Sequence, residues 1–274
     1  MPRPDAASRP LRLVTWNINS VRARLALIDR FLDTYAPDIL CLQETKVADD
    51  QFPRRWFAER GWRHMAIHGQ RSYHGVATLA RVPFNGARSI DWCARGDARH
   101  VQVSLKMFGG KVVLHNFYVP AGGDEPDPEV NDKFAHKLTF LDEMIDWSRG
   151  LDTPSILVGD LNVAPLATDV WNHRALLGVV SHTPPETERL AALADAHGWI
   201  DVMRHFVPPE ETLYSWWSYR ARDWRASNRG RRLDHVWVSP ALAPAMRSMA
   251  VLDAVRGWDK PSDHAPVLVE LDLG

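Results

Sequence analysis

Short apolar runs bounded by turn residues recur along the chain and predict its strands. Some alternate between apolar and polar positions, whereas others are almost wholly apolar, which is typical of buried strands. A Gly-Gly pair joins two of the runs and predicts a β-hairpin. The expected strands are residues 11–16, 38–42, 76–80, 90–93, 101–107, 112–119, 155–159, 233–239 and 267–273.

Apolar residues at helical spacing predict four helices. Ser20 is the candidate N-cap of the first, whose apolar positions run from Val21 to Tyr35 and which Pro37 ends. The other three span about residues 50–60, 130–147 and 190–197. Strands outnumber helices and include hairpins, so we expect an α+β fold with sheets packed face to face and helices outside.

No repeat or long linker divides the chain, which predicts a single domain over residues 11–274. Residues 1–10 contain two arginines but no apolar segment of a secretory signal, and we expect a disordered tail. No apolar run approaches the length of a membrane span, so no membrane contact is expected. The two cysteines, Cys41 and Cys93, have no metal-type spacing, which favours the reducing cytoplasm.

Charge is distributed unevenly along the chain. The net charge of −1 does not indicate a nucleic-acid-binding protein. Residues 219–232, however, contain six arginines against one acid, Asp223, and tryptophans are interleaved at 216, 217 and 224. This segment is a candidate DNA-facing patch, and a solvated basic loop is the alternative.

Polar side chains follow the apolar strands, each at the point where a strand ends or begins. If these ends meet at one rim, carboxylates, amides, an imidazole and a phenol surround one cavity. Burying unpaired charges would be costly, whereas an oxygen-rich cage suits a hard divalent cation and a phosphate. The candidates are Asn17, Glu44, Tyr118, Asp160, Asn162, Asp234, Asp263 and His264.

Each motif alone also has an ordinary structural interpretation. Asp160 and Asn162 could form an Asx-type turn, and Tyr118 could be a core tyrosine with a bonded hydroxyl. Glu44 could be a solvated charge, and Asp263-His264 a simple loop. The same relative position at the ends of six strands favours one shared site.

The same residues carry a resemblance to a known family. The motifs appear in family order from residue 11 to the C-terminus and resemble the exonuclease III family of abasic-site endonucleases, within the endonuclease/exonuclease/phosphatase superfamily. The resemblance implies a four-layered α/β-sandwich of the DNase I-like type, with two packed mixed β-sheets flanked by helices. The motifs are Trp16-Asn17-Ile18-Asn19, Leu42-Gln43-Glu44-Thr45-Lys46, Tyr118-Val119-Pro120, Gly159-Asp160-Leu161-Asn162, Asn228-Arg229-Gly230-Arg231-Arg232-Leu233-Asp234 and Ser262-Asp263-His264.

The resemblance also implies a metal site. Asn17, Glu44 and Asp263 would hold Mg²⁺, for which Mn²⁺ would substitute, and a second metal position would lie near Asp160 and Asn162. One or two carboxylates with an amide suit Mg²⁺, which keeps several waters. The sequence leaves open whether one or two ions bind.

Catalytic roles follow from the same resemblance. Asp160 would deprotonate the attacking water, and Asn162 would donate to the phosphate. His264, oriented by Asp234, would face that phosphate, and Tyr118 would lie against it. Phosphoryl transfer needs these functions. The sequence does not decide between Asp160 and His264 as the base, and Asp160 is favoured because neighbouring acids would raise its pKa.

DNA binding rests on fewer residues. Trp216 would form a wall of the pocket for a flipped-out abasic sugar, and a core tryptophan is the alternative. Asn228, Arg229 and Arg99 are further candidate DNA-binding residues, because backbone phosphates attract such side chains. The partner would be double-stranded DNA with abasic sites or 3′ ends, bound by a monomer.

The expected function is Mg²⁺-dependent cleavage of the phosphodiester 5′ to abasic sites, with 3′→5′ exonuclease and 3′-phosphatase activity. Two alternatives stay open, a superfamily phosphoesterase with a non-DNA substrate and a catalytically silent DNA-binding relative. Four residues depart from the family pattern and leave the balance of the three activities undetermined, namely His74, His100, Ala121 and Arg231.

Overall fold

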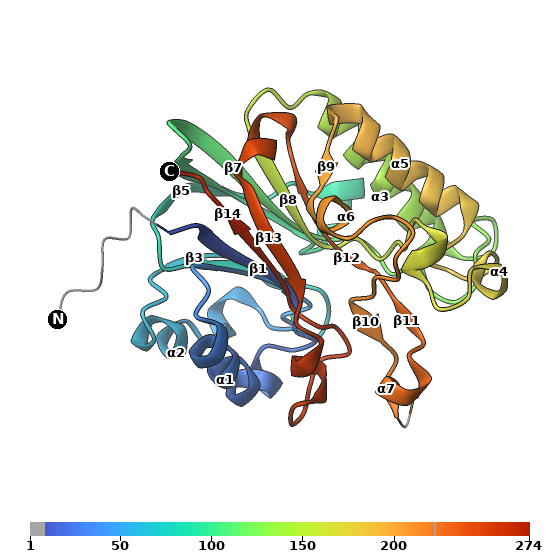
Figure 1. Ribbon diagram of the computed structural model, residues 1–274, viewed down its shortest axis with the longest axis horizontal. Helices are drawn as coiled ribbons and strands as arrows, with labels where there is room; N and C mark the ends of the chain where they lie inside the picture. Colours follow the sequence, from blue (N-terminus) through green and yellow to red (C-terminus); the bar gives the residue numbers. More distant parts are fainter. Residues whose placement is uncertain (1–8, 222) are drawn as a thin grey trace.

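Two six-stranded sheets form the centre of the molecule in the computed structural model, which describes residues 9–221 and 223–274 (Figure 1). The first sheet has the order β13 (Met246–Val251), β14 (Val267–Leu271), β1 (Leu11–Asn17), β2 (Ile39–Gln43), β4 (Val76–Ala80) and β3 (His64–His68). The second has the order β5 (Phe84–Arg88), β6 (His100–Met107), β7 (Gly110–Tyr118), β8 (Ser155–Asp160), β12 (Asp234–Val238) and β9 (Ile200–Asp201). Both sheets mix parallel and antiparallel pairs.

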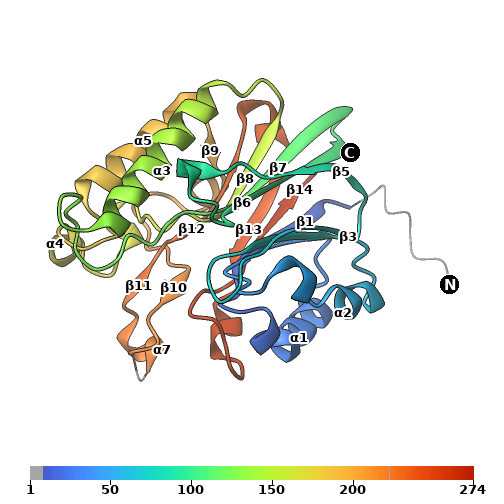
Figure 2. The ribbon, with the colours of Figure 1, turned by 180° about the vertical axis from the view of Figure 1, so that it is seen from behind.

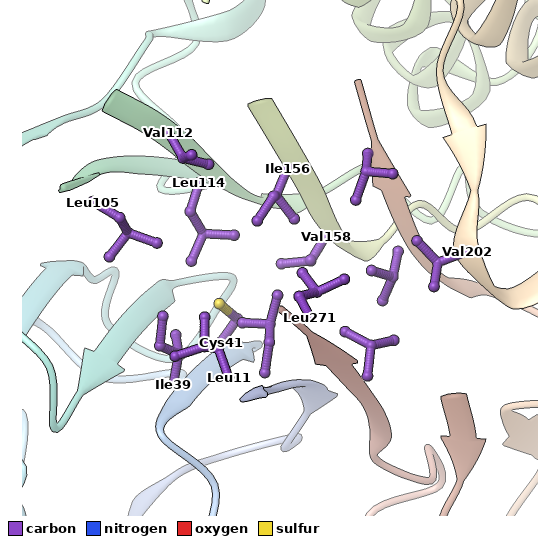
Figure 3. Close-up of a cluster of buried hydrophobic side chains, with 14 of the residues drawn as sticks. Leu11, Ile39, Cys41, Leu105, Val112, Leu114, Ile156, Val158, Val202 and Leu271 are labelled. Atoms are coloured by element: carbon purple, nitrogen blue, oxygen red, sulfur yellow. The ribbon is translucent and has the colours of Figure 1, made fainter. Parts of the chain in front are cut away.

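The largest apolar cluster lies between the two sheets. Ile39 and Cys41 from the first sheet face Leu114, Ile156 and Val158 from the second, all fully buried (Figure 3). The apolar runs of the strands supply this layer, because alternate side chains of a strand point to opposite faces.

Helices cover the outer faces of both sheets (Figures 1 and 2). The first sheet packs against α1 (Leu25–Tyr35) and α2 (Arg54–Glu59), and the second against α3 (Asp132–Arg149) and α5 (Pro184–His197). The expected four-layered sandwich is therefore confirmed. The remaining elements are α4 (His173–Leu176), α6 (Val202–Phe206), α7 (Trp224–Ser227), the hairpin strands β10 (Trp216–Trp217) and β11 (Gly230–Arg231), and 3₁₀ turns at Arg22–Arg24, Asp49–Gln51, Trp92–Ala94, Ala167–Asp169, Pro240–Ala245 and Asp253–Gly257.

Three local predictions were wrong. Ser20 has φ 88° and caps no helix, because a 3₁₀ turn comes first and α1 begins at Leu25. Residues 90–93 form no strand, since a 3₁₀ turn begins at Trp92 and Cys93 has φ 57°. The strand of this region is β5, an edge strand whose mostly exposed side chains leave no apolar pattern. The last helix, α5, begins at Pro184 rather than at residue 190.

Most of the predicted tail, residues 1–8 of 1–10, lies outside the described residues. Arg9 is described and forms a bidentate ion pair with Asp38, with N–O distances of 2.5 and 3.0 Å. No helix within the described ranges has the length and apolar character to cross a membrane.

Strand register aligns the polar strand ends. In the second sheet Asp160 pairs with Tyr118 of β7 on one side and with Asp234 of β12 on the other. In the first sheet Asn17 ends β1 beside Gln43 of β2, and Glu44 follows directly.

Candidate active site

Asn17 joins the two sheets at the rim. Its side-chain amide donates to Glu44 Oε1 at 2.8 Å within the first sheet, and to Asp160 Oδ2 at 2.9 Å across to the second. Asn17 and Asp160 are buried and Glu44 is half-buried, so the Asn17 amide satisfies carboxylate oxygens that are largely shielded from water. The expected cluster of strand ends therefore exists.

His264 lies between two buried aspartates. Its Nδ1 is 2.8 Å from Asp234 Oδ2, and its Nε2 is 3.6 Å from Asp160 Oδ2. A carboxylate at Nδ1 fixes the proton there and orients the ring. One side-chain atom from each of the three residues fits within 4.8 Å of the others.

Burial and charge act in opposite directions on the pKa values of His264 and Asp160. Burial raises the pKa of Asp160 to about 7, although His264 opposes the shift. Burial would lower the pKa of His264, but the carboxylates of Asp234 and Asp160 outweigh it and raise that pKa to about 10. Between these two groups, the shifts favour a proton on His264 over one on Asp160.

Ser215 holds Asp234 in place and was not anticipated from the sequence. It is fully buried, and its hydroxyl donates to Asp234 Oδ2 at 2.7 Å. The Ser215 hydroxyl oxygen accepts the backbone N–H groups of Leu233 and Asp234, both at 3.1 Å. A serine two residues after Leu213 has no distinctive pattern, so only the tertiary contact identifies it.

Asn162 lies on the second-sheet side of the site with φ 54°. Its N–H donates to Asp160 Oδ1 at 2.9 Å, and its side-chain amide donates to Val119 O at 2.8 Å. Below it, the buried ammonium of Lys137 donates to Asn162 O at 2.7 Å and pairs with Glu186. This buried ion pair was also not anticipated.

Tyr118 is largely buried, and the guanidinium of Arg99 lies 5.1 Å from its ring centre. His74 packs on the same ring at 6.0 Å. Burial, together with the charges of Glu44 and Asp160, raises the pKa of Tyr118 well above its usual value, so the phenol stays protonated. Arg99 itself is buried and donates to Asp97 at 2.9 Å, so its described contacts are internal.

The expected metal ligands are linked by Asn19 and Lys46. Lys46 Nζ is 2.7 Å from both Glu44 Oε2 and Asn19 Oδ1, and Asn19 Nδ2 donates to Asp263 Oδ1 at 3.2 Å. Burial opposes ionisation of Glu44, but Lys46 and the Asn17 amide hold its pKa below the usual value. The pKa of Asp263 is lowered too, because His264 and the Trp216 N–H outweigh its burial.

These donors fit a hard divalent cation. Glu44 and Asp263 are ionised carboxylates and offer oxygen ligands. Asn17 and Asn19 also carry amide oxygens, which here accept the Asn19 backbone N–H and the Lys46 ammonium. Lys46 belongs to one of the sequence motifs, but the sequence did not predict its position between Glu44 and Asn19.

A groove of about 790 Å³ adjoins the site. Trp216 lines it, and its indole N–H donates to Asp263 Oδ2 at 3.0 Å, which connects the groove to the carboxylate cluster. Arg229 lines it with its guanidinium 4.7 Å from the Trp171 ring. Asn228 ends α7 with φ 41° and accepts the Trp217 indole N–H at 3.1 Å, so it holds the hairpin that carries these side chains.

Comparisons with known proteins agree with this geometry. The sequence profile of the Endonuclease/Exonuclease/phosphatase family matches residues 14–264. Exodeoxyribonuclease III of Haemophilus influenzae is 31% identical over 95% of this chain and 99% of its own length. An exodeoxyribonuclease of Bacillus subtilis is 29% identical over 96% of this chain and all of its own.

Two solved structures are similar over nearly the whole chain. An AP endonuclease from Archaeoglobus fulgidus superposes with a TM-score of 0.87 at 28% identity, covering 96% of this chain and all of that one. A Neisseria 3′-phosphatase bound to a product DNA hairpin superposes with a TM-score of 0.86 at 29% identity, covering 96% and 99%.

Proposed function

The chain belongs to the endonuclease/exonuclease/phosphatase family and is an exodeoxyribonuclease III-like DNA repair hydrolase, and on that premise we propose how its site works. The substrate is double-stranded DNA with an abasic site or a 3′ end. The enzyme cleaves the phosphodiester 5′ to the abasic site, and it removes nucleotides or a phosphate from 3′ ends. The observation that supports this best is the Asn17–Asp160 contact, which brings the carboxylates of both sheets together at one site.

Asp160 acts as the general base. The attacking water gives its proton to Asp160 while the water oxygen bonds to phosphorus, and the bond from phosphorus to the 3′ oxygen breaks. The 3′ oxygen leaves with the bonding electron pair and takes up a proton from solvent water, so the product ends in a 3′-hydroxyl. The raised pKa of Asp160 supports its role over that of His264, whose high pKa keeps it protonated.

The other side chains stabilise the phosphate as negative charge accumulates on it. His264 presents its Nε2–H beside Asp160 and is kept cationic by Asp234. Asn162 supplies an amide donor, and Tyr118 a phenol that stays protonated. Donors that are fixed before the reaction begins stabilise the transition state without reorganising.

A divalent cation completes the site in this proposal. Asn17, Glu44 and Asp263 would hold Mg²⁺, or Mn²⁺ in its place, and Asp160 and Asn162 would line a second position. A cation held there would supply neutralisation of the negative charge that develops in the reaction. Lys46 keeps Glu44 ionised and ready to bind it.

DNA binding uses the groove and its hairpin. Trp216 is the wall for the flipped abasic sugar, Arg229 contacts a backbone phosphate, and Asn228 positions both. Arg99 contributes by supporting Tyr118. We further propose a monomer, because one chain supplies every site residue, and a cytoplasmic enzyme, because Cys41 and Cys93 are free thiols.

Product analysis tests the proposal. A duplex with one internal abasic site, a recessed 3′ end and, in a second version, a 3′-phosphate is incubated with protein and Mg²⁺, and the products are separated by length and end group. Incision 5′ to the abasic site that leaves a 3′-hydroxyl is expected. Hydrolysis of phospholipid head groups without any DNA cleavage would contradict the substrate assignment.

A further inference from the structure

Arg231 is a half-buried cation in the wall of the groove beside the site. Its guanidinium lies 5.5 Å from the centre of the Trp216 ring. Nη1 donates to Val180 O at 2.9 Å and to Ser181 Oγ at 2.7 Å, which are both neutral acceptors. Its Nε atom is buried and has no hydrogen-bond partner in the part of the chain that the structure describes.

A partly desolvated guanidinium without a carboxylate is unusual, because burying a charge costs free energy unless an opposite charge compensates it. Two other buried arginines are paired, Arg99 with Asp97 at 2.9 Å and Arg232 with Asp169 at 2.7 Å. Arg256 is buried without an ion pair among the described residues, but it lies over the aromatic rings of Tyr219 and Trp224. Among the described residues Arg231 forms no ion pair; Nη1 is bonded to the loop, Nε is buried, and Nη2 has no hydrogen-bond partner. The N–H groups of Nη2 can donate to an oxygen of a phosphate or a carboxylate.

Strand register places Arg231 at a defined distance from the catalytic residues. Trp216 pairs with Arg231 on one side and forms a β-bridge with His264 on the other. Side chains of directly paired residues lie on the same face of a sheet. Arg231 is therefore two strand spacings from His264, roughly 10 Å between backbones, with the Trp216 ring between them.

We propose that Arg231 is a specificity-determining residue that binds a second oxyanion of the DNA substrate, on the 3′ side of the scissile phosphate. This inference rests on the proposed function. With the scissile phosphate at Asp160 and His264, the group attached to its 3′ side lies over Trp216, and an anion beyond that group meets Arg231.

Two kinds of substrate carry such an anion. One is an internal abasic site, whose sugar continues into the next phosphodiester. The other is a 3′ end whose phosphate is esterified to a short fragment with a carboxylate. A plain 3′-phosphate has no second anion, so Arg231 favours the first two substrates over the third.

A matched pair of 3′ ends isolates the charge. In one duplex the 3′-phosphate is esterified with glycolate, and in the other with ethylene glycol, so that a carboxylate is replaced by a neutral alcohol of similar size. The ratio of kcat/KM values for the two esters is measured with Mg²⁺, and the ratio of Kd values is measured with EDTA. We expect the wild type to favour the glycolate ester about tenfold in both, the effect of one charge-assisted hydrogen bond.

Arg231→Gln should bring both ratios close to one and should slow incision at an internal abasic site more than removal of a plain 3′-phosphate. Arg231→Lys keeps the positive charge but lacks the planar guanidinium, so both ratios should be intermediate between those of the wild type and Arg231→Gln. If thermal unfolding shows that Arg231→Gln does not fold, the ratios of Arg231→Lys test the proposal instead. The control is Arg229→Gln in the same groove, which should weaken both esters together and leave the ratio as in the wild type.

Equal loss on all substrates in Arg231→Gln would mean that Arg231 only supports the Val180–Ser181 loop, and would overturn the proposal. A wild type without preference for the glycolate ester would overturn it too. A wild type that binds the glycolate end more tightly but hydrolyses neither ester would refute the proposed function while supporting the oxyanion subsite. The internal abasic duplex then distinguishes a phosphodiester from a carboxylate as the preferred anion.

Discussion

Lys137→Met should lower the free energy of unfolding by about 3–5 kcal/mol, because it leaves the buried carboxylate of Glu186 without its cation. Both side chains are fully buried. The Lys137 ammonium also donates to Ala121 O at 3.3 Å and to Asn162 O at 2.7 Å, so two backbone carbonyls lose a donor. Methionine has a similar length, so the substitution leaves little cavity and the charge dominates the loss.

Urea-induced unfolding followed by tryptophan fluorescence measures this loss. In thermal unfolding, the Tm should fall by roughly 6–20 °C, at about 2–4 °C per kcal/mol for a chain of this size. Lys137→Met with Glu186→Gln should recover part of the stability, because no unpaired charge then stays buried. Lys133→Met is the matched control on the same helix, and its exposed side chain should change stability by less than about 0.5 kcal/mol.

Activity measured well below the Tm should fall as well, since Lys137 holds the backbone of Asn162 against the site. A loss of stability below about 1 kcal/mol in Lys137→Met would refute the reasoning, because removing the cation from a buried carboxylate should cost more free energy than that. If Lys137→Met with Glu186→Gln were less stable than Lys137→Met alone, the unpaired charge of Glu186 would not be the cause of the loss.

Three further predictions concern the site and the core. Asp160→Asn should slow cleavage by at least about a hundredfold while abasic DNA still binds in a gel-shift assay, and a near-normal rate would exclude Asp160 as the base. Glu44→Ala should raise the Mg²⁺ concentration for half-maximal rate; an unchanged titration would remove Glu44 from the ligand set. Burial lowers the pKa of His100 and of His115, so both stay neutral in the folded protein at a pH where they are protonated in the unfolded chain. The free energy of unfolding should therefore drop by about 2 kcal/mol for each histidine between pH 7 and pH 5. His115→Gln should flatten that slope in urea titrations.

The sequence predicted the architecture because its strands are mostly buried. Strands β1, β2 and β8 lie inside their sheets, and their apolar runs were recognised with nearly correct bounds. Strands β3 and β13 were missed, since they lie at sheet edges and are only partly buried. An edge strand shows a weak apolar pattern, because little of it faces the core.

The candidate site was predictable only where function concentrates unusual residues at strand ends. Asp160, Asp234 and His264 were identified in this way and do lie together. Ser215, Lys46 and the Lys137–Glu186 pair were not, because a serine in a loop or a charge on a helix resembles an ordinary surface residue until the tertiary contacts are known. Their roles depend on neighbours far away in the sequence.

The Asn17–Asp160 hydrogen bond shows that the candidate active site lies at the junction of two separately hydrogen-bonded sheets. Neither sheet alone holds the carboxylates in register, so the site assembles only after the layers have docked. A chain caught midway through folding, with one sheet formed, therefore has no competent site and poses no hazard to intact DNA. Conversely, pressure or mild denaturant that displaces one sheet relative to the other should abolish nuclease activity while most of the secondary structure persists.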